Sequence, residues 1–262
     1  MRRLLWVLML CPAWALAQVY ATVDATSGPV HIVSADGSRT AAAVGQTLSV
    51  GQTVQTQADG ELHAVTQDGG FLAVRPNTTL QMLQYRASQD DQASMTLSLV
   101  RGALRSITGW IGKLNPSGYR VNTPTATVGI RGTDHETVVL EHANGRDAPG
   151  TYDTVLEGAT VVRSAQGEIH LQAGEHGYAA RDGAAPPRRL AERPEFLGQR
   201  LLQLEDRIKE RKTKLTDRLQ QAANDNPELA HRLRDRMDNA TDEQREAVRK
   251  RLLRKTQRNR ND

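Results

Sequence analysis

Histidine and acidic side chains, the usual ligands of metal ions, gather in one stretch of the sequence. Asp134, His135 and Glu136 are consecutive, and Glu141-His142 follows shortly after them. Successive side chains of a strand point to opposite faces, so only Asp134 and Glu136 would face the same side. No second histidine lies at the i, i+4 spacing of a helical zinc site. The spacing therefore does not predict a metal centre.

Two pairs of carboxylates have the composition that glycoside hydrolysis requires, namely Asp90-Asp91 and Asp153 with Glu157. A polar loop and a strand supply such acids routinely, so these pairs alone do not indicate a hydrolase. Serines are numerous, but none lies in a G-x-S-x-G context, and the single cysteine is Cys11 near the N-terminus. We expect no catalytic residue and no cofactor.

Residues 121–133, with the sequence VNTPTATVGIRGT, gather threonines, glycines and one arginine around a proline. Pro124 is expected to end a strand, because it forces Thr123 out of the helical region of backbone space. The hydroxyls of Thr123 and Thr125 can bond backbone groups that the turn leaves free. The glycines on either side of Arg131 would allow close passage of another backbone. The candidate contact residues are Thr123, Pro124, Thr125, Gly129, Arg131, Gly132 and Thr133.

Arg131 has two interpretations. In the first, a rigid turn presents its guanidinium group to a carboxylate or phosphate of a partner. In the second, the guanidinium group binds backbone carbonyls and an internal acid, and so holds a buried crossing together. We expect the second, in which Arg131→Ala lowers stability before it abolishes a specific activity.

The elements that must position this stretch are short strands. From Gln18 to about Ala180, short runs alternate in polarity, with a turn signal roughly every ten residues. Asp36-Gly37 and Asp68-Gly69 predict hairpin turns, because glycine supplies the positive φ of a tight turn. About a dozen such strands favour an all-β fold, an antiparallel sandwich or β-roll, into which Trp110 packs as a cap of the core. The expected strands are 29–33, 38–44, 61–66, 71–75, 79–85, 94–100, 103–108, 119–122, 136–141, 151–157, 159–163, 168–172 and 176–180.

The composition changes after this β domain, which we place at residues 18–181. Residues 182–193 contain Gly183 and Pro186-Pro187 and predict a linker. From Pro194 the apolar period becomes about 3.6, which indicates helices. Residues 194–262 are expected to form a charged α-helical segment of three helices. Their narrow apolar stripes must pair with each other, with a second copy or with a partner.

The first 17 residues have the form of a signal peptide. Two arginines precede an apolar run, and Ala15-Leu16-Ala17 is a small-x-small cleavage site. The run of about 13 apolar residues is short of the roughly 20 that a spanning helix needs. Residues 18–262 contain no cysteine and no long apolar run, so no transmembrane segment is predicted in the mature chain. We expect a periplasmic or secreted protein.

The net charge of +4 hides a division along the chain. Residues 18–187 hold 11 Lys and Arg against 16 Asp and Glu, whereas residues 188–262 hold 21 against 14. An acidic body with a basic tail suggests contact with an anionic surface, although a solvated helical face has the same composition. Because export argues against nucleic acid, the expected partner is an envelope protein or an anionic envelope polymer, with possible self-association through the tail.

The stretch VNTPTATVGIRGT resembles the signature of the FecR-like domain, an exported sensor module named for the iron-dicitrate regulator. The resemblance covers roughly residues 40–180 and implies an all-β exported domain for sensing or protein contact, without known catalytic residues. The named regulator resembles a membrane-spanning protein whose cytoplasmic segment controls a sigma factor. A signal peptide takes that place here, so this role is not carried over. Further agreement lies at Gly45, Leu48, Gly51, Val54-x-Thr56, Asp68-Gly69, Arg75-Pro76-Asn77-Thr78-x-Leu80, Val155-Leu156-Glu157-Gly158 and Leu171-x-Ala173-Gly174-Glu175.

The expected function is therefore that of a non-enzymatic exported FecR-like protein that recognises an envelope partner or ligand. The alternative is a structural scaffold that acts through the C-terminal helices. An envelope polysaccharide hydrolase, acting through Asp153 and Glu157, is a further alternative.

Overall fold

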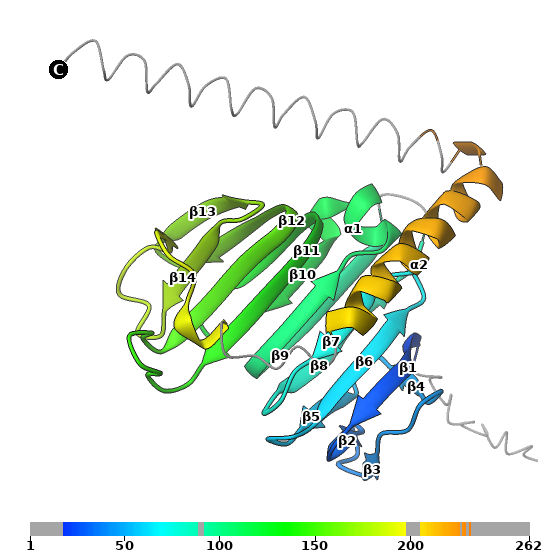
Figure 1. Cartoon of the computed structure of the whole chain (residues 1–262), viewed down its shortest axis with the longest axis horizontal. Helices are drawn as coiled ribbons and strands as arrows, with labels where there is room; N and C mark the ends of the chain where they lie inside the picture. The colour runs from blue at the N-terminus through cyan, green and yellow to red at the C-terminus, as the bar shows by residue number, and fades with distance from the viewer. Residues whose placement is uncertain (1–17, 89–91, 198–204, 226, 229–230, 232–262) are drawn as a thin grey trace, which may run out of the picture.

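The computed structural model describes residues 18–88, 92–197, 205–225, 227–228 and 231 (Figure 1). Within these residues, 15 strands form one continuous sheet, which confirms the predicted all-β body. The predicted signal peptide lies outside them. Every helix in the described part of the chain is too short or too polar to cross a bilayer.

The strands are β1 (Val19–Ser27), β2 (Val30–Val33), β3 (Arg39–Ala41), β4 (Thr47–Ser49), β5 (Thr53–Thr56), β6 (Glu61–Thr66), β7 (Phe71–Val74), β8 (Thr79–Arg86), β9 (Ser94–Ile107), β10 (Tyr119–Asn122), β11 (Thr127–Leu140), β12 (Gly150–Ser164), β13 (Gly167–Gln172), β14 (His176–Ala180) and β15 (Arg188–Leu190). The helices are α1 (Trp110–Leu114) and α2 (Glu205–Asp225), with 3-10 turns η1 (Pro116–Gly118) and η2 (Glu195–Leu197).

Three strands are longer than the sequence predicts, because a glycine bends each of them without ending it. The runs 94–100 and 103–108 are both parts of β9, and 151–157 and 159–163 are both parts of β12. The bends lie at Gly102 in β9, Gly132 in β11 and Gly158 in β12, with φ of +84°, +60° and +78°. At a positive φ the strand changes direction, and its hydrogen-bonded pairing continues beyond the glycine, as in a β-bulge.

These bends divide the continuous sheet into two layers. Sheet I consists of β4, β1, β6, β7, residues 102–107 of β9, 134–140 of β11, 150–157 of β12, β14 and β15. Sheet II consists of β3, β2, β5, β8, residues 94–101 of β9, β10, 127–131 of β11, 159–164 of β12 and β13. The pairings are antiparallel except that between β10 and β9. The result is a β-roll in which three strands pass from one layer to the other.

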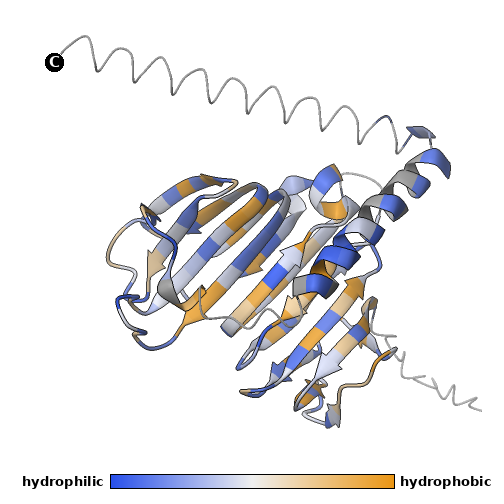
Figure 2. Ribbon diagram, in the orientation of Figure 1, coloured by the Kyte–Doolittle hydropathy of each residue, from blue (hydrophilic) through white to orange (hydrophobic). Residues whose placement is uncertain are grey.

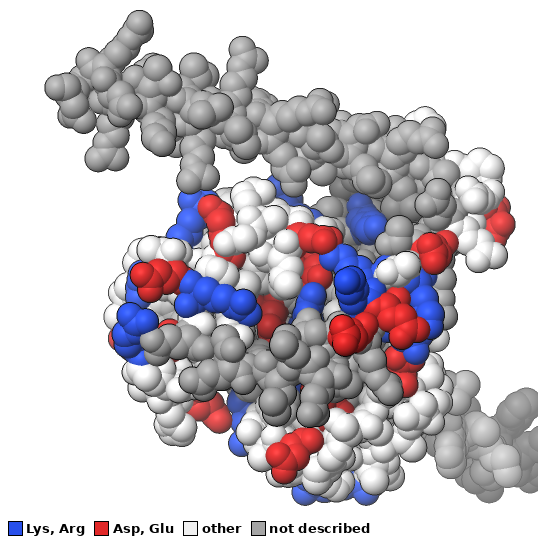
Figure 3. Space-filling view, in the orientation of Figure 1, with Lys and Arg blue, Asp and Glu red and all other residues white. Residues whose placement is uncertain are grey.

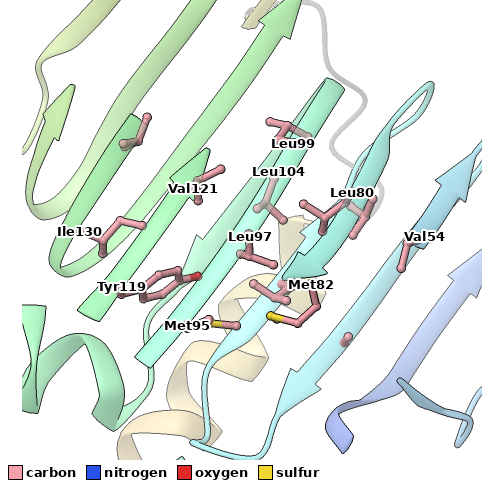
Figure 4. Close-up of a cluster of buried hydrophobic side chains, with 14 of the residues drawn as sticks. Val54, Leu80, Met82, Met95, Leu97, Leu99, Leu104, Tyr119, Val121 and Ile130 are labelled. Atoms are coloured by element: carbon pink, nitrogen blue, oxygen red, sulfur yellow. The ribbon is translucent and has the colours of Figure 1, made fainter. Parts of the chain in front are cut away.

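The main core lies between the two sheets. Leu62 and Leu72 reach it from sheet I, whereas Val54, Leu80 and the residues labelled in Figure 4 reach it from sheet II and from the crossing strands. Apolar and polar residues alternate along the strands, which gives each sheet an inner and an outer face (Figure 2).

The C-terminal segment packs on the outer face of sheet I. Phe196 and Leu197 of η2 join Tyr152 and Tyr178, and Ile208 of α2 joins a cluster with Phe71 and Ile107. Trp110 packs against that second cluster and against the main core, in agreement with its expected role as a cap.

The ends of the predicted linker and tail also differ in detail from the sequence analysis. Residues Arg188–Leu190, inside the stretch predicted as a linker, pair with β14 as strand β15. Of the three helices predicted in residues 194–262, the structure describes α2. The other two fall almost entirely outside the described residues.

We expect Leu97→Ala to lower the free energy of unfolding by about 2–5 kcal/mol, because it leaves a cavity between the sheets. Leu97 is fully buried in β9. Val100 of the same strand is 48% exposed, so Val100→Ala should change the unfolding free energy by less than about 0.5 kcal/mol. Urea denaturation measures both, and equal effects would contradict the two-layer core.

Candidate interaction site at the strand bends

The stretch 121–133 runs from the end of β10 through the proline turn to the bend of β11. Val121, Val128 and Ile130 are fully buried in the main core, and Figure 4 shows Val121 and Ile130 pointing into it. The strand residues beside them, Asn122, Thr127 and Gly129, therefore point to the outer face of sheet II, because successive side chains of a strand alternate. The stretch is a central part of the roll with one exposed side.

The proline turn is tied to the neighbouring strand by its threonines. The Thr123 hydroxyl accepts a hydrogen bond from the Ala126 amide at 3.0 Å and donates to the Ala126 carbonyl at 2.8 Å. The hydroxyls of Thr123 and Thr125 lie 2.7 and 2.6 Å from the Thr151 hydroxyl of β12. Pro124 is exposed. The predicted local bonding of the threonines is thus present, and it extends to β12.

Backbone contacts join the bend of β11 to the two strands beside it. The Thr133 amide donates to the Thr108 hydroxyl at 2.9 Å, and the Thr108 amide donates to the Thr133 carbonyl at 2.9 Å. A Cβ atom on Gly158 would lie 2.4 Å from the Gly132 carbonyl oxygen. Gly129 differs, because a Cβ atom there would meet only the Val161 carbonyl oxygen, at 3.8 Å. The close passage of backbones is therefore at Gly158 and Gly132, and the expectation for Gly129 was wrong.

Arg131 is exposed, so the expectation that it lies buried at a strand crossing is wrong. The alternation that buries Ile130 directs the neighbouring Arg131 side chain outward. Arg120 of β10 is also exposed and lies directly across the ladder from Gly129. Because glycine has no side chain, the sheet surface at Gly129 is left open between Arg120 and Arg131. This open place lies on the outer face of sheet II.

Arg120 was not among the residues singled out from the sequence. Its position beside Gly129 depends on the register between β10 and β11, which the turn between Asn122 and Thr127 sets. The alternation of Tyr119, Arg120, Val121 and Asn122 could have shown only that Arg120 points outward.

The acidic and histidine cluster after the bend divides between the two faces, as the sequence predicts. Asp134 accepts two hydrogen bonds from Arg105, at 2.9 and 3.0 Å, and Glu136 lies 3.4 Å from Arg75 on the same outer face of sheet I. His135 points inward. No group of three metal-ligating residues is present in the part of the chain that the structure describes.

Asp153 and Glu157 lie in different environments and do not form an acid pair. Asp153 is buried, and its carboxylate accepts from Thr137 at 2.8 Å and Thr160 at 2.6 Å, with His135 Nδ1 at 2.9 Å. The Glu157 side chain is 63% exposed and pairs with Lys212 of α2. Asp153 therefore joins the two halves of the bent strands. Glycoside hydrolysis would instead require a carboxylate that reaches a substrate.

A buried carboxylate holds α1 against the bend. Asp68 accepts from Thr66 at 2.5 Å, from Tyr85 at 3.1 Å and from the amide of Ile111 at 3.3 Å. Burial raises the pKa of Asp68 and also that of Tyr85. At the other end of α1, burial lowers the pKa of Lys113, whose Cγ atom lies close to Gly132. Sequence analysis did not single out Lys113, because its burial depends on the bend of β11.

The resemblance noted in the sequence is confirmed by comparison with known families. The family described as FecR protein matches residues 52–170. No curated protein matches the chain.

Two crystal structures, at 1.65 and 2.50 Å resolution, are similar to the chain. Both are of a protein from Parabacteroides distasonis that carries a provisional description as an anti-sigma factor. They share 13% identity with this chain over 56% of its length, with TM-scores of 0.41 and 0.42. The chain spans 62% of the length of that protein, and similarity this low carries no argument about function.

The three glycines of the bend region should respond differently to alanine. Gly132→Ala and Gly158→Ala should each lower the free energy of unfolding by about 2 kcal/mol or more, because both positions have positive φ and Gly158 has no room for a Cβ atom. Gly129→Ala is the matched control and should be neutral or slightly stabilising. Thermal and urea denaturation measure the three variants, and a destabilised Gly129→Ala would contradict the described geometry.

The stability contribution of Asp68 should depend on pH. Its pKa is raised in the folded state, so folding favours the protonated carboxyl group. That contribution is complete below the unfolded pKa of about 4 and is lost as pH rises through the folded pKa. The unfolding free energy of the wild type minus that of Asp68→Asn should therefore fall as pH rises from about 4 toward neutral. A difference that stays constant across this range in urea titrations would show that burial does not shift this group.

Proposed function

We propose, from the premise that residues 52–170 form a FecR domain, that this chain is a non-enzymatic sensing or interaction protein of the cell envelope. The proposal places the contact with its partner on the outer face of sheet II. The expected signal peptide in residues 1–17 supports a periplasmic or secreted location.

The observation that carries the proposal is the open place at Gly129 between two exposed arginines. Arg120 and Arg131 carry exposed, planar guanidinium groups of the kind that suits carboxylates and phosphates, and Gly129 leaves room for such a group to approach the sheet. Thr96 lies across the ladder from Arg120 on the other side and is partly exposed. The chemistry fits an acidic group of an envelope protein or of an anionic envelope polymer.

A photo-crosslinking amino acid at Thr127, which neighbours this place on β11, tests the proposal in intact cells. We expect it to capture a specific partner that the same crosslinker at Val44 does not capture. Val44 is 66% exposed and precedes β4, far from Gly129 in the sheet order. The captured partner is identified by mass spectrometry.

Gly129→Glu and Arg131→Ala should each abolish the Thr127 crosslink without lowering the melting temperature by more than about 2 °C. Gly129→Glu fills the open place and adds a negative charge, whereas Arg131→Ala removes a donor. Arg39→Ala is the matched control, since Arg39 is exposed on β3 and donates to Gln55. A crosslink that survives both variants would contradict the proposal. So would a loss that occurs only together with unfolding.

The scaffold alternative places the partner on the C-terminal helices. A chain that ends at residue 225 keeps α2 and the contacts of Ile208, Arg211 and Lys212 with sheet I. The scaffold would be favoured over the sheet II contact by two results together. The shortened chain would lose the partner, and the Thr127 crosslink would persist in the full chain with Arg131→Ala.

A further inference from the structure

The first turns of α2 lie on the outer face of sheet I (Figure 1), where one side chain of the helix enters an apolar cluster. Ile208 is 1% exposed and packs against Phe71, Ala73 and Ile107, and Trp110 lies against the same cluster. The rings of Phe71 and His63 pack nearly perpendicular to each other, with 5.1 Å between their centroids. One aliphatic side chain of the helix thus fills an aromatic-walled apolar site.

Acidic side chains surround this apolar site, and the helix meets them with basic ones. Arg211 pairs with Asp24 of β1, and Lys212 pairs with Asp134 of β11 at 3.3 Å and with Glu157 of β12. Acidic and basic side chains lie side by side over this face (Figure 3). The helix is therefore held by charge complementarity on both sides of Ile208.

The acids that bind the helix belong to a larger charged network on the sheet. Glu61 lies 3.0 Å from Arg75, Arg75 lies 3.4 Å from Glu136, and Arg105 binds Asp134. Counted with Asp24 and Glu157, these side chains are five carboxylates and two arginines. The net charge of these seven side chains is negative without α2, so this part of the face attracts a basic helix.

The ion pairs of α2 with sheet I are partly exposed, so another helix could replace α2 in them. Lys212 is 32% exposed and its partner Glu157 is 63% exposed, so salt and water weaken that pair. In the same chain η2 is anchored among Tyr152 and Tyr178. That anchor keeps α2 at a high effective concentration near its site, so even a weak contact stays populated.

We propose that the outer face of sheet I is a docking site for a basic helix and that α2 occupies it in cis until a partner helix replaces it. The partner helix would carry the pattern of residues 208–212, an aliphatic residue followed within one turn by two adjacent basic residues. This site is on the opposite layer from Gly129 and Arg131, so the inference goes beyond the proposed function.

The test uses the full chain with Trp6→Phe and Trp14→Phe, which leave Trp110 as its single tryptophan. In this chain, Ile208→Asp should shift the Trp110 emission to longer wavelength, because the charged side chain releases α2 from the cluster that Trp110 contacts. A labelled peptide with the sequence of residues 205–225 should then bind the Ile208→Asp chain about tenfold more tightly than the parent chain, whose site is filled. Fluorescence anisotropy measures the binding.

Two peptide variants separate docking from general charge attraction. The peptide with Arg211→Glu and Lys212→Glu should lose binding, whereas the peptide with Lys214→Glu should keep it, because Lys214 pairs with Glu210 within the helix. If Ile208→Asp lowers the melting temperature of the chain, Arg211→Glu with Lys212→Glu in the chain releases α2 by removing partly exposed contacts instead.

Equal peptide binding to parent and released chains, or no binding to either, would overturn the proposal. An unchanged Trp110 emission in both released chains would also overturn it, since α2 would then not occupy the site. The measurements use purified protein and peptide, so their failure leaves the crosslinking test of the Gly129 face unaffected.

Discussion

The close passage of β12 beneath the bend of β11 is the constraint on which the rest of the structure depends. A Cβ atom at Gly158 would lie 2.4 Å from the Gly132 carbonyl oxygen, so the two strands can bend together only with glycine there. Because β9, β11 and β12 all bend, one sheet becomes two layers that share a core. The bend also exchanges neighbours, since β11 pairs with β10 before Gly132 and with β9 after it.

The bend explains why one short motif serves two faces. Before it, Arg131 and Gly129 lie on the outer face of sheet II, and after it, Asp134 and Glu136 lie on the outer face of sheet I. Between the layers, Asp153 accepts hydrogen bonds from Thr137 of β11 and from Thr160 beyond the bend of its own strand. A buried carboxylate that gathers several donors fixes the relative position of the strands that supply them.

The sequence predicted the elements better than their connections. Alternating polarity and Asp-Gly turns located the hairpins, because these signals are local. Gly102 and Gly158 were predicted to separate strands, because both a bulge and a turn need a residue with positive φ. Only the long-range pairing of the strands distinguishes a bulge from a turn. The burial of Arg131 was predicted wrongly and Arg120 was missed for the same reason, since both depend on the register across β10, β11 and β12. The motif itself was found correctly as the mark of the domain family.

The division of charge along the sequence has a physical counterpart in the fold. Residues 18–187 are acidic, and some of those acids lie on the face of sheet I that receives Arg211 and Lys212 of the basic tail. A tail bound in this way lowers the field that the acidic body presents to solvent, and its release restores that field. The outer face of sheet II, with Arg120 and Arg131, has the opposite preference and suits an anionic group. On the two proposals above, the layers would bind partners of opposite charge, and the bent strands that form both layers join the two faces through one core.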